Sequence, residues 1–130
     1  MIITREVDYA LRIIRSLHKE NKKSANDISK EESIPKNFLY KVTKKLQKGG
    51  VLEISRGSQG GYTLIKDIEK LNILDIITIL GDEIFINECL ESGYKCDNNR
   101  GICKLHKEFS DIQKTLEDQL SRKSLAEILK

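Results

Sequence analysis

Three cysteines and one histidine occupy a short stretch of the sequence, Cys89, Cys96, Cys103 and His106, at the spacing C-x6-C-x6-C-x2-H. Glycine, aspartate and asparagine lie between the cysteines and favour turns, so the thiols should sit on a pliable loop. Thiolate and imidazole are soft and borderline donors that suit iron–sulfur clusters, zinc and copper(I). The stretch predicts a metal or cluster site, and the alternative is three reduced cysteines that lie close together by coincidence.

The cellular compartment follows from the cysteine count and the N-terminus. Three cysteines are an odd number, which argues against a disulfide framework and for a reducing cytoplasm. Charges at Arg5, Glu6 and Asp8 leave no uninterrupted apolar run for a secretory signal. The longest apolar run, near residues 76–80, is too short to span a bilayer. We therefore expect a cytoplasmic protein that does not contact a membrane.

The composition indicates a helix-rich, soluble domain. The chain has 130 residues, of which 33% are charged and 5% aromatic, and this length fits one domain. The net charge of +3 is too small to establish a polyanionic partner. How the charge is distributed along the chain therefore matters more than its total.

The first half of the chain carries the pattern of a helix-turn-helix. Residues 4–19 place apolar side chains on one stripe of a helix that Thr4 can cap, with Asp8 in the first turn, where the helix dipole favours an acid. Ser24 can cap a short second helix over residues 24–31. A third helix should follow Pro35, with Ser33 as its cap, and end at the two glycines 49–50.

A β-hairpin and a basic surface follow this pattern. Two short β-prone runs flank the glycine-rich turn 56–61, which predicts the wing of a winged helix. Residues 33–66 contain seven basic side chains and a single acid, Glu53, so this segment has a local charge of +6. A solvated charged face is the usual explanation for a run of lysines. Because this run coincides with a helix-turn-helix and a wing, we predict DNA binding.

We expect the third helix to enter the major groove, with its N-terminal residues nearest to the bases. The residues predicted to reach base edges are Asn37, Tyr40 and Lys41. The residues predicted to contact phosphates are Lys36, Lys44, Lys45 and Lys48. At the wing tip the predicted DNA contacts are Arg56, Ser58 and Gln59, with Arg56 placed to insert into a minor groove.

The second half of the chain predicts a dimer. A short helix over residues 71–80 leads into an acidic segment without periodicity, 82–103, which holds the cysteines. A long helix then begins at residue 104, and its one narrow apolar stripe consists of Leu105, Phe109, Ile112, Leu116 and Leu120. We favour helix pairing between subunits over packing against the chain's own domain, because helix-turn-helix proteins usually read two half-sites. The last residues should form a short docking helix.

The predicted fold is mostly α with a small β-hairpin. Residues 1–66 form the winged helix-turn-helix domain, 67–81 a connecting helix, 82–103 the cluster loop, and 104–130 the dimerisation helix with the docking segment. No nucleophile–base pair and no phosphate-binding glycine loop is present, because the 57–61 turn lies in a hairpin. We therefore expect that the protein is not an enzyme.

Several motifs together resemble the Rrf2 (Rrf-two) superfamily of winged helix-turn-helix transcriptional regulators, in particular its IscR-type and NsrR-type branches. The resemblance covers essentially the whole chain. The motifs are Asp8-Tyr9-Ala10-Leu11-Arg12, Leu46-x-Lys48-Gly-Gly-Val51, Arg56-Gly57-x-x-Gly60-Gly61-Tyr62-x-Leu64, and the three-cysteine loop before a long helix.

The resemblance implies a homodimer with crossed long helices and an iron–sulfur cluster held by the three cysteines. The fourth ligand would be His106, as in IscR-type members with a [2Fe-2S] cluster, or Asp8 of the partner, as in NsrR-type members with a [4Fe-4S] cluster. We favour His106 and [2Fe-2S] because His106 is tied to Cys103 by local spacing. The chain has six residues between successive cysteines, where those two branches usually have five.

The leading hypothesis is a homodimeric repressor that binds a palindromic operator in double-stranded DNA. Its cluster would sense iron–sulfur status, redox stress or nitric oxide. One alternative is a cluster-free regulator that uses its cysteines as a thiol/disulfide switch or as a zinc site. Another is a small electron-transfer protein, against which the basic helix and wing already argue.

Overall fold

The amphipathic N-terminal segment forms helix α1 (Arg5–Lys19) in the computed structural model, which describes residues 1–97 and 103–130. Thr4 caps the helix and its side-chain oxygen accepts from the Val7 N–H at 3.3 Å. The apolar stripe of α1 is buried and consists of Val7, Ala10, Ile13, Ile14 and Leu17. The predicted helix and its cap are confirmed.

Helices α2 (Ala25–Glu32) and α3 (Lys36–Lys48) form the helix-turn-helix. Ser24 caps α2 as predicted, since its hydroxyl accepts from the Asp27 N–H at 3.2 Å. The prediction that Ser33 caps α3 is wrong. Ser33 ends α2 in the left-handed region, with φ 54°, and its N–H bonds to the Ser29 carbonyl, whereas Pro35 stands at the α3 cap. The chain must reverse direction within a few residues, and a left-handed residue allows that reversal.

Strands β1 (Leu52–Ser55) and β2 (Gly61–Leu64) form the predicted antiparallel hairpin, in which Leu52 faces Leu64. The hairpin is joined to the helices through Lys23 and Tyr62, whose backbone N–H groups donate to each other's carbonyls at 3.2 and 2.8 Å. A Cβ at Gly61 would lie 2.6 Å from the Lys23 carbonyl oxygen, so this close approach requires glycine. The wing is therefore held against the helix-turn-helix at a defined place.

Helix α4 (Ile73–Ile79) follows a single 3-10 turn, η1 (Ile68–Lys70), and begins with a capping box between Asn72 and Asp75. The short helix α6 (Leu125–Ile128) returns to this region, where the Leu125 N–H donates to the Leu71 carbonyl at 2.7 Å. One core runs through all of these elements, and its largest fully buried side chains include Ile13, Ile14, Ile28, Leu39, Leu46, Ile76, Ile77 and Leu125. Burial of each such side chain contributes about 1.5–3 kcal/mol.

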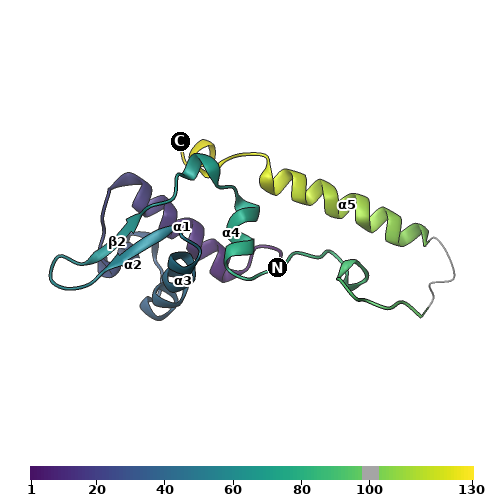
Figure 1. The fold of residues 1–130 in the computed structure, drawn as a ribbon, viewed down its shortest axis with the longest axis horizontal. Coiled ribbons are helices and arrows are strands. Elements are labelled where there is room, and N and C mark those ends of the chain that lie inside the picture. The colour runs from purple at the N-terminus through teal and green to yellow at the C-terminus, as the bar shows by residue number, and fades with distance from the viewer. Residues whose placement is uncertain (98–102) are drawn as a thin grey trace.

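Helix α5 (Lys104–Ser121) extends away from this core, and the segment that contains η2 (Glu88–Leu90) runs beside it (Figure 1). The wing tip and the start of α5 lie at opposite ends of the long axis of the molecule. Gln113 is the buried residue of α5: it donates to the Ile84 carbonyl at 2.6 Å and accepts from the Ile86 N–H at 3.0 Å. This amide therefore fastens the segment before the cysteines to the middle of α5.

The architecture confirms the predicted fold class, mostly helical with one two-stranded hairpin. Across residues 1–97 and 103–130, no helix is both long and apolar enough to cross a membrane.

Candidate DNA-binding surface and cysteine loop

The outward face of α3 carries the residues predicted to contact DNA. Leu39, Val42 and Leu46 turn into the core, which leaves the opposite side of the helix to solvent. The exposed side chains on this face are Lys36, Asn37, Tyr40, Lys41, Lys44 and Lys48, and Lys45 is half-buried at its edge. Tyr40 is 53% exposed, so its ring and hydroxyl are accessible to a ligand.

The wing tip is also open to solvent, because Arg56, Ser58 and Gln59 are exposed in the turn between β1 and β2. A cleft of about 280 Å³ separates the wing from the helix-turn-helix. Tyr40 lines this cleft together with Gly60 of the wing and Asn26 of α2. The α3 face and the wing therefore border the same cleft from opposite sides.

Glu6 of α1 meets this surface from the side, a contact that the sequence did not reveal. Its two carboxylate oxygens accept from the ammonium groups of Lys41 and Lys45, each at 2.6 Å. Glu6 and Lys45 are separated by 39 residues. Glu6 therefore lies outside residues 33–66, and the charge of +6 counted for that segment does not include it. Two of the basic residues predicted to contact DNA are thus already paired within the chain.

The pairing changes the acidity of Glu6. Hydrogen bonds from Lys41 and then Lys45 lower the pKa of Glu6 below its ordinary value of 4.5. A carboxyl group whose folded-state pKa is lowered stabilises the fold above its unfolded-state pKa, and this contribution disappears as the pH falls through the folded-state value. The contribution is therefore present at neutral pH and lost in acid.

Glu6→Gln should remove this acid-sensitive contribution. At neutral pH the variant should be less stable than the wild type by about 1 kcal/mol or less, because Lys41 is largely exposed. The difference in melting temperature should shrink as the pH is lowered from about 7 to about 3, measured by circular dichroism. A difference that stays constant over this range would contradict the assignment.

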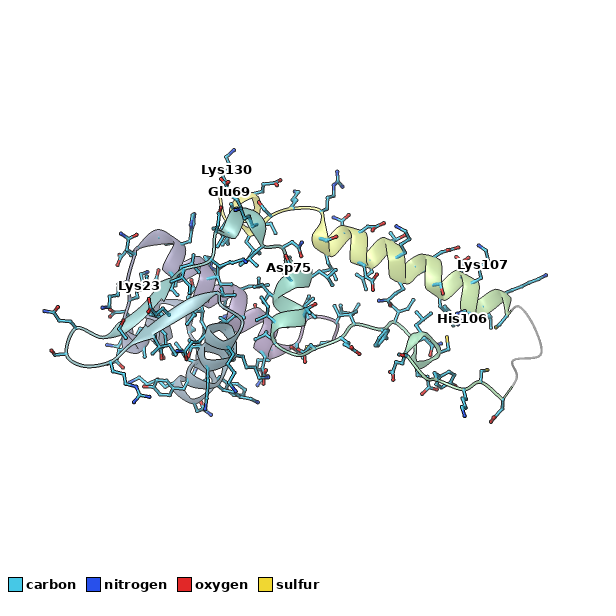
Figure 2. All side chains as sticks on the ribbon, in the orientation of Figure 1. Lys23, Glu69, Asp75, His106, Lys107 and Lys130 are labelled. Carbon is cyan, nitrogen blue, oxygen red and sulfur yellow. The ribbon has the colours of Figure 1, made fainter. Side chains whose placement is uncertain are left out.

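The three cysteines carry free thiols around the start of α5. Cys89 lies in η2 and is half-buried, whereas Cys96 and Cys103 are exposed. Cys103 caps α5, and its sulfur accepts from the His106 N–H at 3.4 Å. The turn η2 packs against α5, and Figure 2 shows His106 at the end of α5 that lies beside this turn.

Tyr94 hydrogen-bonds to an acidic residue of the turn η2. Its hydroxyl donates to the Glu88 carboxylate at 3.5 Å. The charge of Glu88 raises the pKa of Tyr94, and Cys96 and Cys89 add to this effect. Tyr94 is thus tied to Glu88, which precedes Cys89 in the turn η2.

The candidate ligands are not assembled into a metal site within one chain. Among the residues that the structure describes, no three His, Cys, Asp or Glu side chains meet at metal-binding distance. Residues 98–102, part of the predicted cluster loop, lie outside the described residues. The donor set still suits an iron–sulfur cluster chemically, since it offers three unpaired thiols and an imidazole in one region.

Asp8 lies in a different part of the chain. It forms an ion pair with Arg12 at 2.8 Å on α1 and lines a cleft of about 300 Å³. Arg15 of α1 and Leu125 and Leu129 of the C-terminal segment form other parts of this cleft. Asp8 is thus accessible from outside the chain, on the half of the molecule that carries the helix-turn-helix.

The apolar stripe of α5 is only partly covered by the chain itself. Leu105 and Ile112 are 65% and 46% exposed. Phe109 and Leu116 are half-buried, and Leu120 packs against the main core. The part of α5 that projects from the core therefore presents an apolar side to solvent.

The comparisons with known proteins agree with this architecture. The Rrf2 family, described as "Iron-dependent Transcriptional regulator", matches residues 3–130. The chain is similar to the HTH-type transcriptional regulator NsrR of Bacillus licheniformis, with 31% identity over 132 residues, 99% of this chain and 92% of that protein. NsrR of Bacillus subtilis is 33% identical over 106 residues, which cover 79% of this chain and 68% of that protein.

Two solved structures share the fold. T. potens IscR has a TM-score of 0.75 and 22% identity, and the match covers 99% of this chain and 86% of that one. CymR, the global cysteine regulator of B. subtilis, has a TM-score of 0.76 and 20% identity, covering 99% and 96%. The family and the relatives are transcriptional regulators, which confirms the prediction that the protein is not an enzyme. The chain therefore belongs to the Rrf2 family of DNA-binding, winged-helix transcriptional regulators.

Proposed function

We propose that the protein is a homodimeric repressor whose affinity for a palindromic operator is controlled by an iron–sulfur cluster on the cysteine loop. The observation that carries this proposal is the division of one elongated chain into two ends (Figure 1). One end presents the basic face of α3 and the wing, and the other presents free thiols beside an exposed apolar helix.

The DNA-binding part of the proposal assigns α3 to the major groove and the wing tip to a minor groove. Asn37, Tyr40 and Lys41 would meet base edges, whereas Lys36, Lys44 and Lys45 would meet phosphates. Arg56 would enter the minor groove with Ser58 and Gln59 beside it. The support for this assignment is the solvent exposure of the α3 face and of the wing turn.

Lys44→Ala and Tyr40→Ala separate affinity from sequence readout. Loss of one phosphate contact should weaken binding to all duplexes and reduce the slope of log K against log salt by about 0.9. Tyr40→Ala should change the preferred sequence, measured by selection from a random duplex pool. Lys114→Ala is the matched control, because Lys114 is an exposed lysine of α5 that pairs with Asp118. If Lys44→Ala and Tyr40→Ala both bind like the wild type, α3 is not the reading helix.

The dimer part of the proposal pairs the projecting part of α5 with its copy in the partner. The apolar side chains for this contact would be Leu105, Phe109, Ile112, Leu116 and Leu120. The exposure of Leu105 and Ile112 supports the pairing, because large apolar side chains gathered on one side mark an interaction surface. Two reading heads joined in this way would match a palindromic operator.

The cluster part of the proposal assigns Cys89, Cys96 and Cys103 as ligands, completed by His106 or by Asp8 of the partner subunit. When bound, a cluster supplies a group that changes with iron supply, oxidants or nitric oxide. We favour His106, because it lies in the first turn of α5 directly after the Cys103 cap. The description of the family as iron-dependent supports an iron site. The cluster type proposed is [2Fe-2S], with [4Fe-4S] as the alternative if Asp8 is the ligand.

The chain's own contacts offer a route from the loop to the DNA-binding half. The Thr4 hydroxyl donates to the Asp82 carboxylate at 3.1 Å, and Thr4 caps α1. Gln113 holds the following residues against α5. A loop that is ordered by its ligand would therefore change the restraint on α1 and the spacing of the two reading heads.

A second candidate is the same regulator without iron. Cys96 and Cys103 are exposed thiols, which favours a thiol/disulfide switch, and three cysteines with a histidine would also suit zinc. Metal and sulfide analysis of anaerobically prepared protein distinguishes these possibilities. Zinc without sulfide supports the zinc site, and no metal together with thiol-dependent DNA affinity supports the disulfide switch.

A further inference from the structure

Glu6 is the feature of the molecule that the proposed function leaves unused. Asn37, Lys41, Lys44 and Lys48 are spaced i, i+4, i+7 and i+11 and therefore share one face of α3. Lys41 stands within this face, yet its ammonium group turns away to Glu6. Lys45, one turn further along α3, also turns to Glu6. One carboxylate thus holds two cations at the border of the DNA-binding surface.

The contact is not needed to join α1 to α3. The two helices already pack through fully buried apolar side chains, among them Val7 on α1 and Leu39, Val42 and Leu46 on α3. Glu6 is the least exposed member of the group, with 18% of its side chain exposed. The carboxylate is therefore a sheltered acceptor beside two longer, more exposed lysine side chains.

The lysines remain free to exchange partners. Lys41 is 58% exposed and Lys45 is 37% exposed. Ion pairs with such exposure are weak, and a long lysine side chain can swing from a carboxylate to a nearby phosphate. Glu6 and DNA phosphates consequently compete for the same two ammonium groups.

We propose that Glu6 is a specificity-determining residue that withholds Lys41 and Lys45 from nonspecific DNA. Nonspecific binding depends almost entirely on phosphate neutralisation, so two paired lysines weaken it directly. In the specific complex α3 would lie deep in the major groove. Base contacts there would hold Lys41 against the DNA, so that its ammonium group would leave Glu6. Glu6 would then lower nonspecific affinity more than operator affinity. This inference rests on the proposed placement of α3 against DNA.

The test uses the whole chain and a duplex of mixed sequence over a range of salt concentrations. Glu6→Gln should tighten binding several-fold at low salt and steepen the slope of log K against log salt by up to about 1.8, for two regained contacts. Glu69→Gln is the matched control, because it makes the same change in net charge at an exposed side chain of η1, outside the proposed DNA-binding surface. Its slope should equal that of the wild type. A Glu6→Gln slope no steeper than that of Glu69→Gln would overturn the inference.

A double-mutant cycle tests whether the effect passes through the two lysines. In the Lys41→Ala/Lys45→Ala background, Glu6→Gln should no longer change the slope. A persistent change would mean that Glu6 acts through the general charge of the protein, which contradicts the proposal. Far-UV circular dichroism and melting curves confirm that each variant is folded.

The Lys44→Ala variant separates a failure of this inference from a failure of the DNA-binding assignment. If Lys44→Ala flattens the salt slope while Glu6→Gln does not steepen it, the DNA surface stands and only the role of Glu6 is wrong. If Lys44→Ala leaves the slope unchanged, α3 is misassigned and both proposals fail.

Discussion

Ile112→Glu is expected to convert the protein into a monomer and to lower its affinity for an operator by about 100-fold or more, because two linked half-site contacts become independent. Ile112 lies in the middle of α5 and is 46% exposed in the single chain. In the paired helices its side chain would be buried, and an unpaired carboxylate at that place would lose its hydration without compensation. Sedimentation velocity measures the association, and fluorescence anisotropy measures the DNA affinity.

The control for this prediction is Lys114→Glu, which introduces the same residue on another face of α5. Lys114 is 74% exposed and pairs with Asp118 one helical turn away. Such a solvent-exposed pair contributes little to stability, so the dimer should persist. A wild-type protein that sediments as a monomer at micromolar concentration would contradict the proposed pairing of α5, as would an Ile112→Glu variant that remains a dimer.

Cys103→Ser is expected to abolish iron and sulfide binding with little effect on the fold. Cys103 caps α5 through its sulfur, and serine is one of the preferred N-cap residues, so the helix start should be preserved. The serine hydroxyl is not ionised near neutral pH and would not replace a thiolate ligand. Anaerobic reconstitution followed by iron and sulfide analysis and visible absorption measures the loss.

Tyr94→Phe is the control for this second prediction. Tyr94 lies between Cys89 and Cys96 in the sequence and bonds to the Glu88 carboxylate, but it supplies no ligand in the proposed site, so the variant should retain the cluster. His106→Ala and Asp8→Ala, measured in the same assay, decide the fourth ligand, and we expect the larger loss for His106→Ala. Full retention of iron by Cys103→Ser would exclude Cys103 as a ligand.

The elements of the DNA-binding half could be predicted because their signals are local. Thr4, Ser24 and the glycines 49–50 mark helix ends within a few residues of the apolar stripes that they bound. Ser33 shows where such signals mislead, because serine suits a helix start but the reversal between α2 and α3 uses it in the left-handed region. A residue type alone does not distinguish these two roles.

The contacts that shape the candidate sites were not predictable, because they join distant parts of the chain. Glu6 reads as an ordinary first-turn acid, and only the packing of α1 on α3 brings it to Lys41 and Lys45. Gln113 reads as one more polar residue on a charged helix, yet it is buried against the backbone of residues 84 and 86. Periodicity indicates which side of a helix is apolar, whereas these pairings depend on the tertiary arrangement.

The central claim is that a cluster on the cysteine loop controls DNA affinity, and one anaerobic comparison tests it most directly. A duplex is first selected from a random pool with each of two forms, the reconstituted protein and the same preparation stripped of iron. Both forms are then titrated against the selected duplexes. We predict iron and sulfide in the reconstituted form, an affinity difference of about tenfold or more between the two forms, and a Cys103→Ser variant that behaves like the stripped protein. A reconstituted protein without iron, or equal affinities of the two forms, would contradict the claim.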